Sequence, residues 1–569
     1  MNLKKWNKKD APDQQKVYKL SKELSVSKVI CSLLVQRGID SFEKAKTFFR
    51  PQINMLHDPY LMMGMDKAVD RLVSAVSKKE KIRIYGDYDV DGTTSVSIMY
   101  HFLQSQNAIC DYYIPDRYQE GYGISYIGID DAIDNGITLM VCLDCGIKAV
   151  DKVSYASEKG LEIIICDHHS PGNELPNAYA ILDPKRKDCS YPFKELCGCG
   201  IGFKLLQAYL IRKKLDLSIA NAYLDLVAVA IGADIVPMVG ENRVLAYFGL
   251  KQLNENTRPG MKALIKQHKR FGEMTITDVV FSIAPRINAA GRMRHAKSVV
   301  ELLLQEEAEA EKIAVEIEKD NIERRLTDQR ITKEALTQIK TLKEEHRQST
   351  VVCNYDWHKG VIGIVASRLI ENYYRPTVVF TKSKGHLVAS ARSVIGFNIY
   401  EALDSCSEYI EQFGGHKYAA GLTIKQENYE GFKKSFEKVV SETITEKQML
   451  EPLDIDAELD FSDITPGFFN ILKQFEPFGP ENRAPLFITR NVIDKGHSRL
   501  VGSENEHLKL SICSEKNTLL VMNAIAFNMG AYWEHIRKGL PFDICYSIQE
   551  NNWKGKTSIQ LAVKDIRLQ

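Results

Sequence analysis

The sequence predicts an α/β fold in which two α/β domains, joined by a long helix, surround a central cleft, and a small β-barrel follows. Over about the first 300 residues, short apolar runs alternate with helical patterns, which is the order of a doubly wound parallel sheet. A second α/β stretch follows a long charged helix, and short β-rich runs fill the last part of the chain. With 569 residues and 44% hydrophobic content, the chain is large enough for about two to four domains with real cores.

The strands of the first domain are expected near residues 81–85, 108–114, 138–143 and 161–166, where apolar runs recur between helical patterns. Buried runs of this length are typical of parallel strands. In open α/β sheets, ligands collect at the carboxyl ends of the strands. Polar residues that directly follow these runs are therefore expected to converge on one crevice.

Acidic residues and histidines follow three of these runs. Asp87, Asp89 and Asp91 alternate with other residues after the first run, Asp144 follows residues 139–143, and Asp167-His168-His169 follow residues 163–166. Two carboxylates about 5 Å apart repel by roughly 3 kcal/mol at an effective dielectric near 20, so such a cluster needs cations or protons. For one aspartate motif alone, a solvated turn that caps the next helix is the alternative. The expected convergence favours a metal site instead.

A fourth candidate ligand is Asp234, which closes the apolar stretch 226–233. Taken alone, Asp234 could equally be a carboxylate at a helix end. Carboxylates with one or two imidazoles suit Mn²⁺ or Mg²⁺ better than a structural zinc site, which normally uses thiolates. The sequence therefore predicts a divalent-cation site, and manganese fits the mixed oxygen and nitrogen ligands best.

The cysteines and the net charge restrict the other possibilities. Cys142 and Cys145 have the spacing of a zinc or redox pair, and Cys197 and Cys199 lie close together, but we expect all twelve cysteines to be reduced thiols that fill space. The net charge is only +1, although Arg286, Arg292, Arg294, His295 and Lys297 form a local basic cluster. The charged N-terminus lacks an apolar secretory segment, and the apolar stretch 224–239 is interrupted by two aspartates, so we expect a cytoplasmic protein.

Five segments are predicted along the chain. They are an N-terminal helical lead (1–66), a first catalytic α/β domain (67–300), a connector helix (301–348), a second α/β domain (349–447) and a small β-barrel (455–569). The connector could be one long helix or two joined end to end. A coiled-coil dimer is the competing interpretation, but the apolar spacing is irregular for strict heptads.

The polar motifs occur in the order of a known series. They are Gly86-Asp87-Tyr88-Asp89-Val90-Asp91-Gly92, Leu143-Asp144-Cys145-Gly146, Asp167-His168-His169 and Gly232-Ala233-Asp234. This order resembles the DHH phosphoesterase superfamily. Residues 284–293 (APRINAAGRM), 357–366 (WHKGVIGIVA), 390–393 (SARS) and 414–421 (GGHKYAAG) extend the resemblance. Within the superfamily, the chain is similar along essentially its whole length to the RecJ family of bacterial single-strand-specific 5′→3′ DNA exonucleases.

The resemblance implies a pair of divalent ions about 3.5 to 4 Å apart, bridged by Asp144. One ion would be held by Asp89 with Asp87 nearby, and the other by Asp91, His168 and Asp234. His169 would contact the phosphate or the leaving group and would not be a ligand. The simpler DHH phosphatases begin their first motif with a His where this chain has Tyr85, so the first metal site is expected to differ.

The resemblance also implies residues that bind the substrate. Arg117, Arg286, Ser390 and Arg392 would hold a 5′ phosphate, and His358 and His416 would line the second domain's side of the cleft. Each of these arginines could instead belong to a structural ion pair. The barrel would be an OB fold that binds single strands, with Trp553 and Lys554 as candidate contacts.

The implied function is metal-dependent hydrolysis of single-stranded DNA from a 5′ end to 5′ mononucleotides, in DNA repair and recombination. The expected partners are the strand itself, a single-strand-binding protein and a helicase, and the expected state is a monomer. Three alternatives remain, namely a DHH oligoribonuclease or cyclic-dinucleotide phosphodiesterase, a DHH pyrophosphatase, and an inactive scaffold that binds single strands. The C-terminal barrel argues against the first two, and the complete set of carboxylates and histidines argues against the third.

Overall fold

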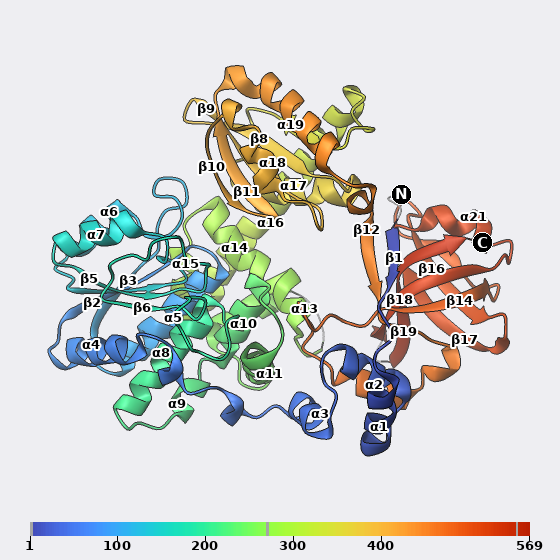
Figure 1. The fold of residues 1–569 in the computed structure, drawn as a ribbon, viewed down its shortest axis with the longest axis horizontal. Helices are drawn as coiled ribbons and strands as arrows, with labels where there is room; N and C mark the ends of the chain where they lie inside the picture. The colour runs from blue at the N-terminus through green and yellow to red at the C-terminus, as the bar shows by residue number, and fades with distance from the viewer. Residues whose placement is uncertain (1–3, 269–271, 554–555, 569) are drawn as a thin grey trace. The chain divides into compact units, whose positions relative to one another are not determined.

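The structure, a computed structural model, describes residues 4–268, 272–553 and 556–568 (Figure 1). Its contacts divide the chain into two compact units. The first unit comprises Arg50–Arg325 with Glu476–Arg483, and the second comprises Met1–Phe49, Leu326–Phe475 and Ala484–Gln569. The N-terminal segment therefore packs with the second unit, and the division falls inside the predicted connector. The five predicted segment boundaries stay a prediction.

Five parallel strands form the sheet of the first unit, in the order β3-β2-β4-β5-β6. They are β2 (Lys81–Gly86), β3 (Ile109–Tyr113), β4 (Leu139–Leu143), β5 (Glu162–Cys166) and β6 (Ala180–Leu182). The four predicted strands are thus confirmed. The chain runs from β2 outward to β3 and then back across β2 to β4, so the strand order reverses between β2 and β4. Open α/β sheets bind their ligands at such a switch point.

Helices cover both faces of this sheet (Figure 1). Because side chains alternate along a strand, Val141 and Leu143 join the core cluster with α4, α5, α8 and α10, while Met140 and Cys142 join the opposite cluster with α6 and α7. The helices of this unit are α4 (Met65–Ser77), α5 (Val90–Ser105), α6 (Tyr126–Asp134), α7 (Val150–Glu158), α8 (Gly198–Arg212), α9 (Ser218–Asn221), α10 (Leu224–Asp234), α11 (Gly240–Glu255), α12 (Pro259–Lys266), α13 (Ile276–Asp278), α14 (Ala284–Met293) and α15 (Lys297–Leu304).

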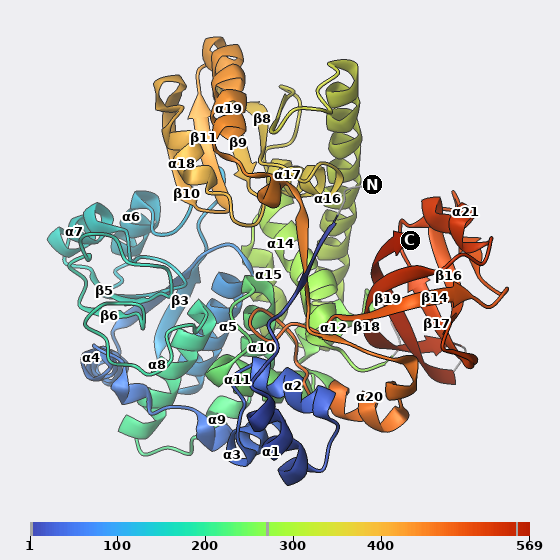
Figure 2. The same ribbon diagram turned by 45° about the vertical axis from the view of Figure 1, so that its right-hand side comes forward.

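The predicted connector is one continuous helix, α16 (Glu307–Thr341), which is 35 residues long (Figure 2). Its C-terminal half packs with α17 (Ile362–Asn372) on one face of the second unit's mixed sheet, and α18 (Ile399–Asp404) and α19 (Tyr429–Thr443) pack on the other face. The sheet has the order β10-β11-β9-β8-β7. Its strands are β7 (Thr350–Cys353), β8 (Thr377–Ser383), β9 (His386–Arg392), β10 (Ile410–His416) and β11 (Ala419–Ile424).

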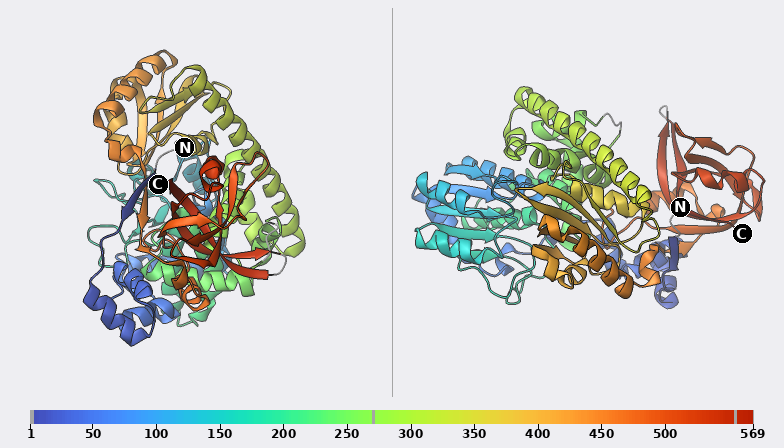
Figure 3. Two further views of the ribbon diagram at one scale, coloured as in Figure 1. Left: turned by 90° about the vertical axis from the view of Figure 1, so that its right-hand side faces the viewer. Right: turned by 90° about the horizontal axis from the view of Figure 1, so that it is seen from above.

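The C-terminal part of the chain forms a closed five-stranded barrel (Figure 3). Its strands are β14 (Phe487–Asp494), β16 (His507–Ser514), β17 (Asn517–Ala526), β18 (Phe542–Trp553) and β19 (Lys556–Leu568). The pairing of β14 with β16 closes the barrel, and β17 pairs with β19 in parallel, which is the strand arrangement of an OB fold. The short strands β13 (Ala457–Glu458) and β15 (Arg499–Val501) extend it, with helices α20 (Pro466–Lys473) and α21 (Trp533–Ile536) nearby. The predicted barrel is thus confirmed.

The N-terminal lead was expected to be helical, and it contains α1 (Gln14–Leu24), α2 (Lys28–Gln36) and α3 (Phe42–Phe49). It begins, however, with the strand β1 (Lys4–Lys8), which pairs in parallel with β12 (Glu451–Ile455). The indole Nε1 of Trp6 donates a hydrogen bond to Asp565, 2.7 Å away. The sequence of a short charged segment does not indicate pairing with a strand so far along the chain, so β1 was not predicted. No helix among the described residues has both the length and the apolar character needed to cross a bilayer.

Candidate metal centre

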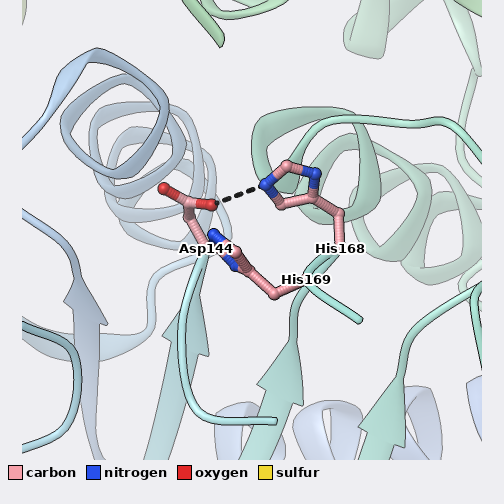
Figure 4. Close-up of side chains that lie close together, drawn as sticks. All are labelled: Asp144, His168 and His169. Carbon is pink, nitrogen blue, oxygen red and sulfur yellow. Dashed lines mark ion pairs between the residues drawn. The ribbon is translucent and has the colours of Figure 1, made fainter. Parts of the chain in front are cut away.

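Four separate elements bring the predicted ligands together at the carboxyl edge of the first unit's sheet. Asp91 lies in the first turn of α5 after β2, Asp144 directly follows β4, His168 follows β5, and Asp234 is the last residue of α10. His168 Nε2 lies 3.2 Å from Asp144 Oδ1, 3.5 Å from Asp234 Oδ2 and 3.9 Å from Asp91 Oδ2. Figure 4 shows the Asp144 carboxylate and the His168 ring pointing toward one another. The expected convergence is therefore observed.

The N-terminus of helix α8 holds the Asp91 carboxylate in place. The backbone N–H of Gly198 donates to Asp91 Oδ2 at 2.7 Å, and that of Cys199 donates to Oδ1 at 2.8 Å. These N–H groups have no partner within the helix, and the positive end of the helix dipole favours a carboxylate there. Helix α8 thus fixes a buried ligand through backbone atoms alone.

Asp144 has a left-handed backbone, with φ at +59°. Only glycine, asparagine and aspartate adopt this conformation with ease. The carboxylate packs against Gly198, where an added Cβ would lie 2.6 Å from the Cβ of Asp144. Gly198 therefore serves two ligands, since its N–H binds Asp91 and its missing side chain leaves room for Asp144.

Several buried donor atoms of the centre have no hydrogen-bond partner among the described residues. Among them are Asp144 Oδ1 and both ring nitrogens of His168. Burial, and then the neighbouring His169, lower the pKa of His168 to about 3, so its ring is neutral and offers a lone pair. Burial, and then the charge of Asp91, raise the pKa of Asp144 well above its usual range.

The same causes act on the other two carboxylates. Burial, and then the charge of Asp89, raise the pKa of Asp91 to about 7. Burial, and then the charge of Asp91, raise the pKa of Asp234 to about 8. A divalent cation would stabilise all three carboxylates in their charged form. The donor set of carboxylate oxygens and a neutral imidazole suits Mn²⁺ or Mg²⁺.

Two groups of donors could hold an ion. Asp91, His168 and Asp234 offer ligand atoms within 4.8 Å of one another, and so do Asp144, His168 and His169. The described residues form these two groups, and neither group includes Asp87 or Asp89. Asp87 is buried, and burial and the charge of Asp89 raise its pKa well above the usual range. The role of these two residues in a first metal site stays a prediction.

Tyr85 takes no part in the ligand set. Its hydroxyl donates to the carbonyl oxygen of Gly123 at 2.9 Å, and its ring stacks on Tyr113 at 5.4 Å between centroids. The side chain lies in the core cluster between the sheet and α6. The position that carries a His in simpler DHH phosphatases is therefore occupied by a core residue.

His169 is organised by neighbouring residues for which the sequence predicts no separate role. Asp167 Oδ1 accepts from His169 Nδ1 at 2.7 Å, and Asp167 Oδ2 accepts from the backbone N–H of Ile147 at 2.9 Å. Burial acts to raise the pKa of Asp167, but the hydrogen bond and charge of His169 outweigh it and hold that pKa at about 2. The hydroxyl of Tyr122 lies 3.1 Å from His169 Nε2. Tyr122 gives no signal in the sequence, because its loop is far along the chain from His169.

The two predicted arginines of the first unit have different surroundings. The guanidinium of Arg117 lies over the ring of Tyr88, 4.5 Å from its centroid, next to the aspartate loop. Arg286 is buried, its Nε lies 2.6 Å from Glu318 Oε2, and its Nη1 donates to the carbonyl oxygen of Ser282. Arg286 thus forms a structural ion pair, which was the alternative to a role in phosphate binding. A phosphate would have to share the Arg286 guanidinium with Glu318.

The mixed sheet of the second unit carries three of the predicted substrate-binding residues, namely Ser390, Arg392 and His416. Arg392 on β9 and His416 on β10 lie in one cross-strand row on either side of Ala419, so they share a face. Arg392 Nη1 donates to Ser390 Oγ at 3.1 Å. Gly363, in the first turn of α17, would bring an added Cβ within 3.0 Å of both side chains. His358 precedes α17, and its Nδ1 accepts from the N–H of Gly360.

The predicted barrel contacts fall at the turn between β18 and β19. Trp553 ends β18, but its side chain, like Lys554, lies outside the described residues. Another face of the barrel, formed by β15, β16 and β17, is also exposed. Arg499 pairs with Lys509, and Lys509 pairs with Ile525, so basic and apolar side chains share one row across β15, β16 and β17. Phe527, just beyond β17, is exposed beside this row.

The carboxylates predict how stability depends on pH. In the metal-free protein, Asp91 and Asp234 stay protonated up to about pH 7 and 8, whereas in the unfolded chain they lose their protons near pH 3.8. The folded state then holds more protons than the unfolded state, so its stability falls as pH rises from 6.5 to 8, above the range where His168 titrates.

Thermal unfolding of the metal-free protein should therefore show a lower midpoint at pH 8 than at pH 6.5. Because Mn²⁺ binds the deprotonated carboxylates, saturating Mn²⁺ should raise the midpoint more at pH 8 than at pH 6.5. Asp234→Asn removes one of the carboxyl groups whose pKa is raised, so the fall in midpoint between pH 6.5 and pH 8 should be smaller. Equal midpoints and equal Mn²⁺ effects at both pH values would show that the pKa values of these carboxyl groups are not raised.

Comparison with known proteins gives a consistent result along the chain. The DHH family N-terminal domain matches residues 81–231, the DHHA1 domain matches residues 347–442, and the RecJ OB domain matches residues 455–565. The single-stranded-DNA-specific exonuclease RecJ of Bacillus subtilis (strain 168) is 38% identical over 558 residues, which are 97% of this chain and 70% of that protein.

Solved structures are similar over nearly the whole chain. The crystal structure of RecJ from Thermus thermophilus in complex with Mn²⁺ has a TM-score of 0.84 and 26% identity, and covers 99% of this chain and 79% of that chain. The structure of the Thermus protein in complex with Mg²⁺ has a TM-score of 0.79 and 25% identity, and the match covers 99% of this chain and 78% of that chain. Both were solved with a divalent cation of the kind that the donor set predicts.

Proposed function

Because the chain belongs to the RecJ family of single-stranded-DNA-specific exonucleases, we propose that it digests single-stranded DNA from the 5′ end at a centre built on Asp91, Asp144, His168 and Asp234. It is a metal-dependent exonuclease of single-stranded DNA, and its cofactor is Mn²⁺ or Mg²⁺. The observation that carries the proposal is the set of buried donor atoms without hydrogen-bond partners within reach of one another.

The residues of the centre have separate tasks in phosphodiester hydrolysis. Divalent ions held by these residues would supply a water activated for attack and positive charge beside the scissile phosphate. Asp91 and Asp234, which lie 3.9 Å and 3.5 Å from His168 Nε2, would offer carboxylate oxygens to an ion, and the neutral His168 ring would offer a lone pair. Asp167 orients His169, which together with the Tyr122 hydroxyl offers donors for phosphate oxygens. Asp87 and Asp89 would hold the first ion.

Recognition of the 5′ phosphate is assigned to Arg117, Arg286, Ser390 and Arg392. A phosphate monoester at a strand end calls for several hydrogen-bond donors, and arginines bind it through two parallel hydrogen bonds. Support comes from the hydrogen bond between Arg392 and Ser390, which pack closely against Gly363, and from His416 in the same cross-strand row as Arg392. His358 would add a further contact at the start of α17.

The barrel would hold the strand on the 3′ side of the cut through backbone charge and base stacking. The row of Arg499, Lys509 and Ile525 with Phe527 is the face that we assign to this contact, together with Trp553 and Lys554. A role in DNA repair and recombination, a cytoplasmic location, a monomeric state, and a single-strand-binding protein and a helicase as partners complete the proposal.

The function is tested by digestion of a 5′-labelled DNA single strand with Mn²⁺. We expect 5′ mononucleotides as the first labelled product, no reaction with EDTA in place of metal, and much slower attack on a duplex of the same sequence. A 3′-labelled copy of the strand should release its label last. A circular single strand should resist, because it has no end to engage.

Several outcomes would contradict the proposal. Early release of the 3′ label would refute the polarity, and cleavage of the circle would refute the requirement for an end. Faster hydrolysis of dinucleotides than of long strands would favour the oligoribonuclease alternative. Binding of the strand without hydrolysis at any Mn²⁺ concentration would leave only the inactive scaffold.

A further inference from the structure

Ile235, the residue after Asp234, has a backbone conformation that its side chain disfavours. It ends helix α10 with φ at +57° and ψ at +33°, in the left-handed region. Helices often end in this conformation, but usually with Gly or Asn, because a branched Cβ clashes with the backbone there. Among the non-glycine residues with positive φ that the structure describes, Ile235 alone carries a β-branched side chain.

Packing does not explain this choice of residue. The side chain of Ile235 is 62% exposed, whereas its neighbours Val236 and Ile231 are buried. An exposed isoleucine gains little from the hydrophobic effect, so burial does not offset the backbone strain. Strained residues persist near active sites when the strained arrangement itself has a use.

The surroundings of Ile235 indicate what it could contact. Neighbouring Cα atoms are about 3.8 Å apart, so the side chain begins one residue away from a donor of the metal centre. The side chains of this centre present carboxylates, imidazoles and a hydroxyl, all of which bind metal ions or phosphate. A nucleotide also presents an apolar surface, namely the sugar ring and the base next to the phosphate. Ile235 is an exposed apolar group one residue from a donor of the metal centre, and an apolar group is what contact with a nucleoside requires.

We propose that Ile235 is a substrate-contacting residue that packs against the deoxynucleoside next to the scissile phosphate. This inference rests on the proposed function and adds a residue to it. The left-handed turn projects the side chain outward from the end of α10, where a glycine or asparagine would leave no apolar contact. The strained backbone then destabilises the fold slightly, whereas the exposed side chain strengthens substrate binding.

The test compares Ile235→Gly, Ile235→Asn and Ile235→Val on a 5′-phosphorylated DNA strand with Mn²⁺. Gly and Asn both fit the left-handed backbone, so their thermal midpoints should equal or exceed that of the native protein. Their kcat/KM should fall about tenfold, mostly through a higher KM, because an apolar contact with the substrate is lost. Ile235→Val keeps the branched apolar side chain and should stay within about twofold of native.

Two controls separate a contact from an indirect effect. Lys214 also has a left-handed backbone, at φ +54° and after helix α8, so Lys214→Gly relieves a similar strain at an exposed site and should leave kcat/KM unchanged. Mn²⁺ affinity, measured by calorimetry, should be the same in native protein and Ile235→Gly, because Asp234 is intact.

Three results would overturn the proposal. They are a native kcat/KM in Ile235→Gly, a weaker Mn²⁺ affinity that accompanies the loss of activity, and a lower thermal midpoint in Ile235→Gly. The second result would make Ile235 a positioning residue for Asp234, and the third would make it a packing residue. Failure of the proposed function looks different, since the native protein itself would then release no mononucleotides.

Discussion

Asp144→Asn should lower kcat for single-stranded DNA by roughly 10³-fold, because it removes the carboxylate that is expected to bridge the two ions. Asp144 Oδ1 lies 3.2 Å from His168 Nε2 and has no hydrogen-bond partner among the described residues. An amide in its place keeps the shape of the side chain but loses the negative charge. The measurement is single-turnover digestion of a labelled strand at saturating Mn²⁺.

Asparagine is the right substitution because residue 144 has φ at +59°. Asn tolerates the left-handed backbone, whereas Ala would add strain and confuse a folding defect with a catalytic one. The thermal midpoint of metal-free Asp144→Asn should equal or exceed that of the native protein, since a buried carboxylate with a raised pKa is replaced by a neutral group. Activity within tenfold of native would show that Asp144 is not part of the metal centre.

Gly198→Ala should impair both the metal centre and the fold. The added Cβ would lie 2.6 Å from Asp144 Cβ and 2.8 Å from Asp144 Oδ1, which is closer than real contacts allow. Either Asp144 or the first turn of α8 must move, and α8 also holds Asp91 through the N–H groups of Gly198 and Cys199. A shift of about 1 Å in catalytic groups costs on the order of 10²-fold in rate. Overpacking should also lower the free energy of unfolding by about 1–3 kcal/mol.

Gly200→Ala is the matched control in the same helix. Its added Cβ would meet the side chains of Leu196, at 3.3 Å, and Cys197, at 3.7 Å, and Ala is favoured over Gly within a helix by about 0.5–1 kcal/mol. We expect Gly200→Ala to keep native activity and stability. Equal activity in Gly198→Ala and Gly200→Ala would show that the close packing against Asp144 has no catalytic role.

The main features of the metal centre could be predicted from the sequence, because they follow strands. Asp144 and His168 directly follow the apolar runs of β4 and β5, and parallel strands bring their carboxyl ends to one edge. Asp234 was less certain from the residues alone, since it ends a helix and helices point in many directions. The motif order of the superfamily, and not the pattern of apolar residues, placed it with the others.

Other features depend on contacts between residues far apart in the chain. The N–H of Gly198 and the carboxylate of Asp91 are 107 residues apart, and no spacing rule links a helix start to a distant aspartate. The ion pair of Arg286 with Glu318 and the pairing of β1 with β12 are of the same kind. The left-handed backbone at Ile235 could not be predicted either, because a β-branched residue normally argues against that conformation.

The central claim is that Asp91, Asp144, His168 and Asp234 bind divalent cations. Anomalous diffraction at the manganese absorption edge, from crystals grown with Mn²⁺, tests it most directly. We predict an anomalous peak within about 2.0 to 2.3 Å of His168 Nε2 and of carboxylate oxygens of this group, and its absence in Asp144→Asn or a marked loss of its height. Strong peaks elsewhere, with none among these four side chains, would contradict the account.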